Sequence, residues 1–190
     1  MIGIFGGSFD PVHHGHLIVG QVAAERMKLD SLRFLPAREQ PFKVGRHRTG
    51  AEHRAAMLLH AVAGARSLTV DRSELNRPGP SYTVDTLREL RRQEPAAEFV
   101  LLIGADAAAE LPAWKEAERL PELARIAVFG RPGSPVPSLP WITTVVEVPA
   151  IGISATEVRR RAREGLSLRY WVPDAVAEYI ASHRLYLDPE

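Results

Sequence analysis

Short runs of consecutive apolar residues, separated by segments with helical periodicity, constrain the fold of this chain more than any other feature. In the clearest run, residues 98–103 (EFVLLI), apolar side chains follow one another without the alternation expected of a strand that has one solvated face. Such runs are typical of strands buried on both faces, which occur in parallel sheets covered by helices. The sequence therefore predicts an α/β fold built on a doubly wound parallel sheet.

The order of the expected elements indicates one domain, residues 1–190, with a small helical extension at about 154–190. Strands are expected at residues 1–5, 31–37, 68–70, 98–103, 126–129 and 143–148. Helices are expected at residues 14–28, 51–65, 83–93, 107–123 (interrupted at Pro112 and Pro121), 154–164 and 173–183. Segments with loop compositions are residues 38–50 and 130–140, and the first strand is expected to end in a tight turn at Gly6-Gly7. Ligands of doubly wound sheets bind at the carboxyl ends of strands, so the loops at Gly6 and Gly104 are the first candidates for a site.

Composition narrows the functional classes. The chain has 190 residues, a formal net charge of +1 and no cysteine. The small net charge argues against binding of nucleic acid or of a membrane surface, and no apolar run is long enough to cross a bilayer. Asp10, His13 and His14 interrupt the apolar opening, so we expect no signal peptide. The lack of cysteine fits a cytoplasmic location, and the sequence is compatible with a homo-oligomer.

Residues 6–16 (GGSFDPVHHGH) carry the strongest chemical signal. Gly6-Gly7 allows backbone N–H groups to approach an anion closely, and Gly15 lets a helix begin against a ligand with its positive dipole end forward. His13 and His16 share a face of that helix and can donate hydrogen bonds to phosphate oxygens as charge develops. The alternatives are a glycine turn with solvent-exposed histidines and a zinc site, and the lack of cysteine and of a carboxylate at ligand spacing disfavours zinc.

This segment resembles the signature G-x-F-D-P-x-H-x-G-H of the nucleotidyltransferase superfamily, whose fixed positions are matched by Gly7, Phe9, Asp10, Pro11, His13, Gly15 and His16. The resemblance implies a Rossmann-like fold and transfer of a nucleotidyl group from a triphosphate, with Mg²⁺ and release of pyrophosphate. It also implies that the two histidines are catalytic and contact the triphosphate and the α-phosphorus. The ATP-binding residues that it implies here are Gly6, Gly7, Ser8, Phe9 and Gly15.

A second anion site is predicted at residues 153–159 (ISATEVR). Ser154 opens an S-x-x-E capping box, which by itself is a sufficient structural explanation of the serine. Thr156 offers another hydroxyl in the first turn, and the cations that follow, Arg159 among them, would oppose the helix dipole unless an anion is bound. The segment resembles the superfamily's I-S-S-T-x-x-R signature, which holds the β- and γ-phosphates, with Ala155 in place of the second serine.

Further segments resemble the bacterial nicotinate-nucleotide adenylyltransferases, which join ATP and nicotinate mononucleotide into deamido-NAD. Residues 36–43 are similar to that family's substrate loop, which usually ends Pro-Pro-His-Lys. Here Phe42 replaces the histidine, while Lys43 is kept as a candidate catalytic cation. Gly104 and Asp106 match the family's G-x-D at the end of the central strand, where the aspartate reaches the nucleotide.

The same resemblance implies an acceptor site. In that family backbone amides near Tyr82-Thr83 hold the nicotinate carboxylate, and the indole at the position of Trp114 stacks on the pyridine ring. Arg131 belongs to a matching R-P-G near the acceptor phosphate, and Lys115 stands where relatives often have an aromatic residue. If only the backbone N–H of Lys115 contacts the acceptor, that difference is harmless. The structural alternatives are a capped helix with a half-buried tyrosine and a tryptophan that packs in the core.

The expected reaction needs no nucleophilic side chain, because the acceptor phosphate is itself an anion that can attack the α-phosphorus in line. The sequence has no evident pair of carboxylates for a metal, so we expect Mg²⁺ to be carried mainly by the ATP phosphates and water. Adenylyltransferases for nicotinamide mononucleotide or pantetheine phosphate and cytidylyltransferases stay open as alternatives. So do a metal-dependent hydrolase and a catalytically silent nucleotide-binding module.

Overall fold

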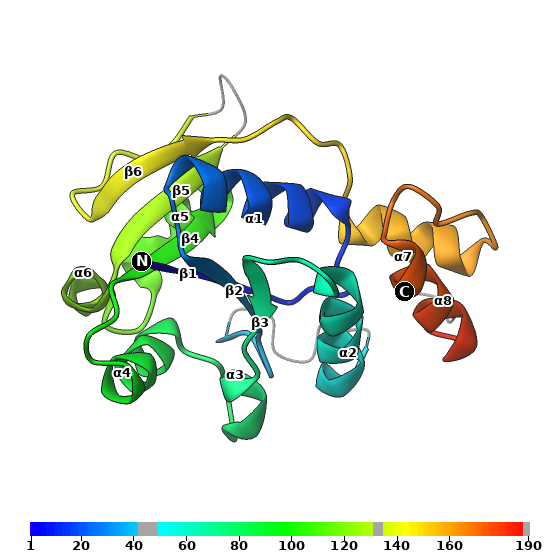
Figure 1. Ribbon diagram of the computed structural model, residues 1–190, viewed down its shortest axis with the longest axis horizontal. Helices are drawn as coiled ribbons and strands as arrows, with labels where there is room; N and C mark the ends of the chain where they lie inside the picture. The colour runs from blue at the N-terminus through cyan, green and yellow to red at the C-terminus, as the bar shows by residue number, and fades with distance from the viewer. Residues whose placement is uncertain (42–48, 131–134, 188–190) are drawn as a thin grey trace.

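A six-stranded parallel sheet forms the centre of the computed structural model, which describes residues 1–41, 49–130 and 135–187. Within these residues the strand order is β3-β2-β1-β4-β5-β6 (Figure 1). The strands are β1 (Ile2–Gly7), β2 (Ser31–Pro36), β3 (Leu68–Val70), β4 (Phe99–Gly104), β5 (Arg125–Gly130) and β6 (Ile142–Glu147). The order changes direction between β1 and β4, which makes this pair the switch point of a doubly wound sheet. The predicted fold class is confirmed.

Both faces of the sheet carry a hydrophobic core, which explains why apolar residues do not alternate along its strands. Successive side chains of β4 point to opposite faces, so Val100 and Leu102 join one core while Phe99, Leu101 and Ile103 join the other. The first core is covered by α1 (His14–Arg26), α2 (Ala51–Val62), α7 (Ala155–Arg163) and α8 (Asp174–Ser182). The second is covered by α4 (Thr83–Gln93), α5 (Ala105–Glu110) and α6 (Leu120–Leu123).

The predicted tight turn at Gly6-Gly7 is wrong, because both glycines continue β1. They pair with Leu35 and Pro36 of β2 in parallel register. Glycine at position 7 allows the Phe9 ring to pack closely against the strand, since a Cβ there would lie 2.9 Å from Cζ of Phe9. The chain leaves the sheet only after this strand, so the segment of residues 8–13 connects β1 to α1.

Two short helical regions differ from the sequence prediction. α3 (Ser73–Asn76) was not predicted, because four residues show no periodicity and so short a helix depends on its surroundings. The interrupted helix expected at residues 107–123 is a series of short pieces, with η2 (Leu111–Ala113) and η3 (Ala117–Arg119) between α5 and α6. Pro112 and Pro121 lie in the first turns of η2 and α6, where the missing N–H costs little.

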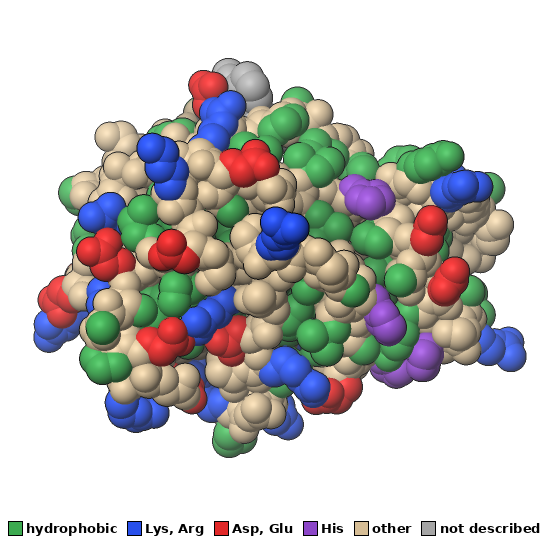
Figure 2. Space-filling view, in the orientation of Figure 1, with side chains coloured by type: hydrophobic (Ala, Val, Ile, Leu, Met, Phe, Trp, Pro, Cys, Tyr) green, Lys and Arg blue, Asp and Glu red, His purple; other side chains and the backbone are tan. Residues whose placement is uncertain are grey.

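The expected C-terminal extension is present as α7 and α8 at one end of the molecule, where α8 packs against α2 (Figure 1). Acidic and basic side chains are interspersed over the face drawn in Figure 2, and histidines gather near α8. The rings of His53 in α2 and His183, which follows α8, have centroids 5.3 Å apart. Across the described residues, each helix is too short or too polar to cross a membrane.

Candidate active site

Two cavities open at the carboxyl ends of β1 and β4, where the strand order changes direction. One, of about 520 Å³, is named the histidine cavity here and is lined by residues that include His13, Gly15, His16, Gly104 and Asp106. The other, of about 670 Å³, is named the tryptophan cavity and is lined by residues that include Gly6, Gly7, Tyr82, Thr83, Trp114 and Lys115. Phe5 lines the first cavity, whereas its neighbours Ile4 and Gly6 line the second. The alternation of a strand therefore places the cavities on opposite sides of β1.

His13 and His16 form a stacked pair in the wall of the histidine cavity. Their ring centroids are 3.8 Å apart, and the backbone N–H of His13 donates to Nδ1 of His16 at 3.3 Å. His13 is the N-cap residue of α1, which confirms that the two histidines share one face of the helix start. The buried Nδ1 of His13 has no hydrogen-bond partner among the described residues and lies against Gly15, where an added Cβ would be 2.9 Å from it.

The surroundings of this pair keep both imidazoles neutral in the free protein. Burial lowers the pKa of His13 to about 4, and the nearby His14 adds to the effect. Burial also holds the pKa of His16 well below its ordinary value, with a smaller contribution from His13. Phe9 supports the pair from the core, where its ring centroid lies 5.0 Å from that of His16. Phe9 is 2% exposed, so in this structure it is a packing residue.

The start of α7 adjoins the histidine cavity through Ile153. The predicted cap is confirmed, because the Ser154 hydroxyl accepts a hydrogen bond from the N–H of Glu157 at 3.2 Å. Arg159 donates to the carbonyl of Asp10 at 2.9 Å and to the Thr156 hydroxyl at 3.3 Å. The structure therefore joins the two segments that the sequence singled out, although they lie 149 positions apart.

The tryptophan cavity brings together four of the residues predicted for the acceptor, namely Tyr82, Thr83, Trp114 and Lys115. Trp114 is partly buried against the core, and its buried Nε1 has no hydrogen-bond partner among the described residues. No side chain in that part of the structure caps the N-terminus of α4 at Tyr82, so the positive end of the helix borders the cavity. The Lys115 ammonium group donates to Asp85 at 2.8 Å and lies 4.7 Å from the centroid of the Tyr82 ring.

The remaining predicted residues either lie away from the histidine cavity or fall outside the described residues. Gly6 and Gly7 were predicted to bind ATP, which would place them in the histidine cavity. In the structure they line the tryptophan cavity instead. The Ser8 hydroxyl donates to Oε1 of Gln40 at 2.8 Å and so connects the β1–α1 segment to a residue of the tryptophan cavity. The candidate residues Lys43 and Arg131, like Phe42, lie outside the described residues.

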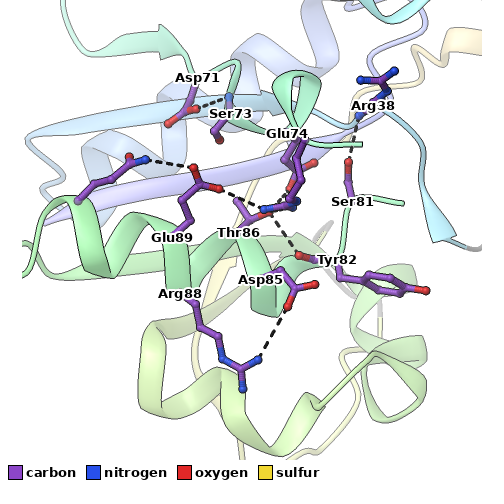
Figure 3. Close-up of polar contacts among 12 residues, drawn as sticks. Arg38, Asp71, Ser73, Glu74, Ser81, Tyr82, Asp85, Thr86, Arg88 and Glu89 are labelled. Atoms are coloured by element: carbon purple, nitrogen blue, oxygen red, sulfur yellow. Dashed lines mark hydrogen bonds and ion pairs between the residues drawn. The ribbon is translucent and has the colours of Figure 1, made fainter. Parts of the chain in front are cut away.

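The sequence analysis predicted no polar network at the start of α4, where the structure shows a buried one (Figure 3). Glu74, which is 7% exposed and lines the tryptophan cavity, accepts a hydrogen bond from the Thr86 hydroxyl at 2.7 Å. Arg77 donates to the same hydroxyl at 2.6 Å, and the backbone N–H of Arg38 donates to the Ser81 hydroxyl at 3.1 Å. Burial raises the pKa of Glu74, although its hydrogen bonds with Thr86 and Ser81 oppose the change. A glutamate in a short charged segment has the pattern of a solvated side chain, so the sequence did not indicate that Glu74 is buried or which groups it contacts.

Comparison with known proteins identifies the family of the chain. The family model described as cytidylyltransferase-like matches residues 4–161. The chain is 51% identical over 185 residues to a probable nicotinate-nucleotide adenylyltransferase of Thermus thermophilus, covering 97% of this chain and 98% of the relative. It is 46% identical over 194 residues to a protein of the same name from Thermomicrobium roseum, covering 97% and 91%.

The fold is also found among solved structures. Plasmodium falciparum nicotinic acid mononucleotide adenylyltransferase complexed with NaAD superimposes with a TM-score of 0.79 at 19% identity, covering 97% of this chain and 96% of that one. Its complex with APC gives a TM-score of 0.76 at 18% identity. At these identities the structural likeness supports the shared fold, while the sequence relatives and the family model establish descent. The chain therefore belongs to the cytidylyltransferase-like family, in the group of the nicotinate-nucleotide adenylyltransferases.

Proposed function

We propose that this protein transfers AMP from ATP to nicotinate mononucleotide, giving nicotinate adenine dinucleotide and pyrophosphate. The observation that carries the proposal is the pair of cavities at the end of β1, one with two stacked neutral imidazoles and one with a partly buried indole beside a helix N-terminus. Relatives named for this activity match nearly the whole chain. The triphosphate occupies the histidine cavity and the pyridine nucleotide the tryptophan cavity, so the reacting phosphates meet at the carboxyl end of β1.

The protein's part in the reaction is alignment and electrostatic stabilisation. The acceptor phosphate attacks the α-phosphorus in line, and pyrophosphate leaves. His13 and His16 donate hydrogen bonds to oxygens whose charge grows in the transition state. The N-terminus of α7 with Ser154, Thr156 and Arg159 receives the β- and γ-phosphates, and Lys43 and Arg131 supply further positive charge to the two substrates.

Magnesium enters this proposal with the triphosphate. Mg²⁺ in such sites is usually bound by substrate phosphates, water and one or two carboxylates. The carboxylate that lines the histidine cavity is that of Asp106, so the donor set fits a metal held mainly by phosphate oxygens. When bound, the ion would neutralise charge on the leaving pyrophosphate.

The acid form of the pyridine nucleotide fits the tryptophan cavity better than the amide. Trp114 offers an aromatic face for the pyridine ring, and the N–H groups at the start of α4, near Tyr82 and Thr83, favour an anion over a neutral amide. The adjacent carboxylate of Asp85 is paired with Lys115, which reduces its repulsion of an acidic substrate.

The test is pyrophosphate release from Mg-ATP with nicotinate mononucleotide, its amide and phosphopantetheine assayed side by side, and with Mg-CTP as an alternative donor. We expect kcat/KM for the acid to exceed that for the amide at least tenfold, which corresponds to about 1.4 kcal/mol. A tenfold preference for the amide would overturn the acceptor assignment. Absence of pyrophosphate with every acceptor and donor would overturn the reaction itself.

A further inference from the structure

A buried polar cluster joins the residue 6–16 segment to two distant parts of the chain. Its members are Asp10 of that segment, Arg54 of α2 and Tyr186 near the C-terminus. Asp10 and Arg54 are 5% and 1% exposed, and none of the three lines either cavity. The proposed reaction assigns them no contact with substrate, yet charged groups are rarely buried unless they are paired and hydrogen-bonded.

Arg54 connects three separate segments through their backbone carbonyls. Its guanidinium donates to Ser8 at 2.7 Å, to Arg38 at 3.1 Å and to Thr49 at 3.1 Å. The planar guanidinium fork suits this task, because its N–H groups point in fixed and divergent directions. Burial lowers the pKa of Arg54, and the nearby Asp10 carboxylate opposes that change. The cluster thus pairs a buried positive charge with a buried negative one.

Tyr186 connects the C-terminal segment to the same cluster. Its hydroxyl donates to Oδ1 of Asp10 at 2.7 Å, and the Thr49 side chain is a second hydrogen-bond partner. Burial and the Asp10 carboxylate raise the pKa of Tyr186, so the phenol stays protonated and remains a donor. The backbone of Tyr186 is left-handed (φ 64°), which is uncommon for a residue with a side chain and persists where the surroundings enforce it.

We propose that Tyr186 is a positioning residue for nucleotidyl transfer, which holds Asp10 and, through it, the backbone that carries His13 and His16. The inference rests on the proposed function, because the histidines act there on the triphosphate. Asp10 precedes His13 by three residues, so a change at Asp10 moves the stacked imidazoles relative to the α-phosphorus. A displacement of about 1 Å at a reacting group can cost about 100-fold in rate. The loss falls on kcat, because the histidines donate most strongly in the transition state.

The test compares Tyr186→Phe with Tyr179→Phe. The first variant removes only the hydroxyl that donates to Asp10, and kcat should fall about tenfold or more while KM for Mg-ATP and for nicotinate mononucleotide stays within about twofold. Tyr179 of α8 is a matched control, since its hydroxyl also makes a hydrogen bond to a distant part of the chain, but the partner is Nδ1 of His53 in α2, at 2.9 Å, and not a residue of 6–16. Tyr179→Phe should keep the kcat of the unaltered protein.

Amide hydrogen exchange supplies a readout that does not depend on turnover. Exchange at residues 6–16 should become about tenfold faster in Tyr186→Phe and remain unchanged in Tyr179→Phe. If the unaltered protein releases no pyrophosphate, the proposed function fails while the exchange measurement still tests the positioning role. Unchanged kcat and exchange in Tyr186→Phe, or equal losses in both variants, would overturn the proposal. Arg54→Lys, which keeps the charge but not the three-way fork, provides a second variant expected to lower kcat and speed exchange in the same way.

Discussion

In the free protein, His13 and His16 are neutral hydrogen-bond donors and acceptors, because burial lowers the pKa of both. A triphosphate bound as proposed would bring negative charge next to them and favour their protonated forms again. The imidazoles would therefore become positively charged only when the nucleotide is bound. The free protein does not have to bury these two charges. This change in protonation depends on the burial of the two imidazoles in the cavity wall, which exists only in the folded protein.

The first residue-scale prediction concerns His16→Ala. Loss of one donor aimed at the transition state typically costs about 100-fold in kcat, while the free energy of unfolding should change by less than about 1 kcal/mol because the ring faces a cavity. The measurement is pyrophosphate release together with urea unfolding. His14→Ala is the control, since His14 is not among the residues that line either cavity. Similar kcat losses in both variants would contradict a direct role for His16.

The second residue-scale prediction concerns pH and stability. The folded-state pKa of His13, about 4, lies below the ordinary value of 6.5, so the unfolded chain binds the proton more tightly. The contribution to stability is complete above pH 6.5 and is lost as pH falls towards 4, by about 3 kcal/mol in all and about 2 kcal/mol at pH 5. His13→Gln should therefore lose less stability than the unaltered protein between pH 7 and pH 5. Urea unfolding at both pH values checks this, and equal losses would show that His13 does not titrate as described.

At the scale of elements, the helix starts decide where anions can bind. The first turn of α7 has a side-chain cap from Ser154, so its hydroxyl already serves one backbone N–H. The first turn of α4 has none within the described structure, and the Glu74–Thr86 network holds that turn against the loop at Arg38. Figure 3 shows these side chains converging from α3, α4 and the neighbouring loop. The two helix starts therefore border different cavities, and different hydrogen bonds hold them in place.

The element-scale prediction separates capping from phosphate binding at Ser154. Ser154→Ala should lower the free energy of unfolding by about 1 kcal/mol through loss of the cap. Ser154→Asp keeps a good capping oxygen but adds a negative charge where the triphosphate is proposed to bind, so stability should be retained while KM for Mg-ATP rises at least tenfold. Unfolding and steady-state kinetics on the two variants check this. An unchanged KM in Ser154→Asp would place the phosphates elsewhere.

At the scale of the whole molecule, the switch between β1 and β4 creates both cavities at once. The connections that follow β1 and β4 lead to opposite faces of the sheet. The carboxyl ends of these adjacent strands therefore border two separate cavities. The histidine segment turns towards one space, and the 104–114 region runs from the first to the second. Two substrates can thus be bound separately and still meet at the end of β1.

Much of this arrangement could be predicted from the sequence, because it depends on neighbours along the chain. The uninterrupted apolar run at 98–103 predicted strands buried on both faces, and the three-residue spacing of His13 and His16 predicted a shared helix face; the structure confirms both. The Ser154 cap was predicted for the same reason. The turn at Gly6-Gly7 was wrong because strand pairing with β2 overrides the local preference of glycine.

What only the tertiary structure decided is which distant groups meet. The sequence by itself determined the sheet type, the family signatures and the candidate site segments, since each is encoded within a few consecutive residues. It did not indicate the buried contacts of Arg54, Glu74 or Tyr186, whose patterns are those of ordinary polar side chains. Their partners lie 46, 12 and 176 positions away, at Ser8, Thr86 and Asp10. Such pairs form because the packed sheet and helices exclude water around them, and burial makes their hydrogen bonds necessary.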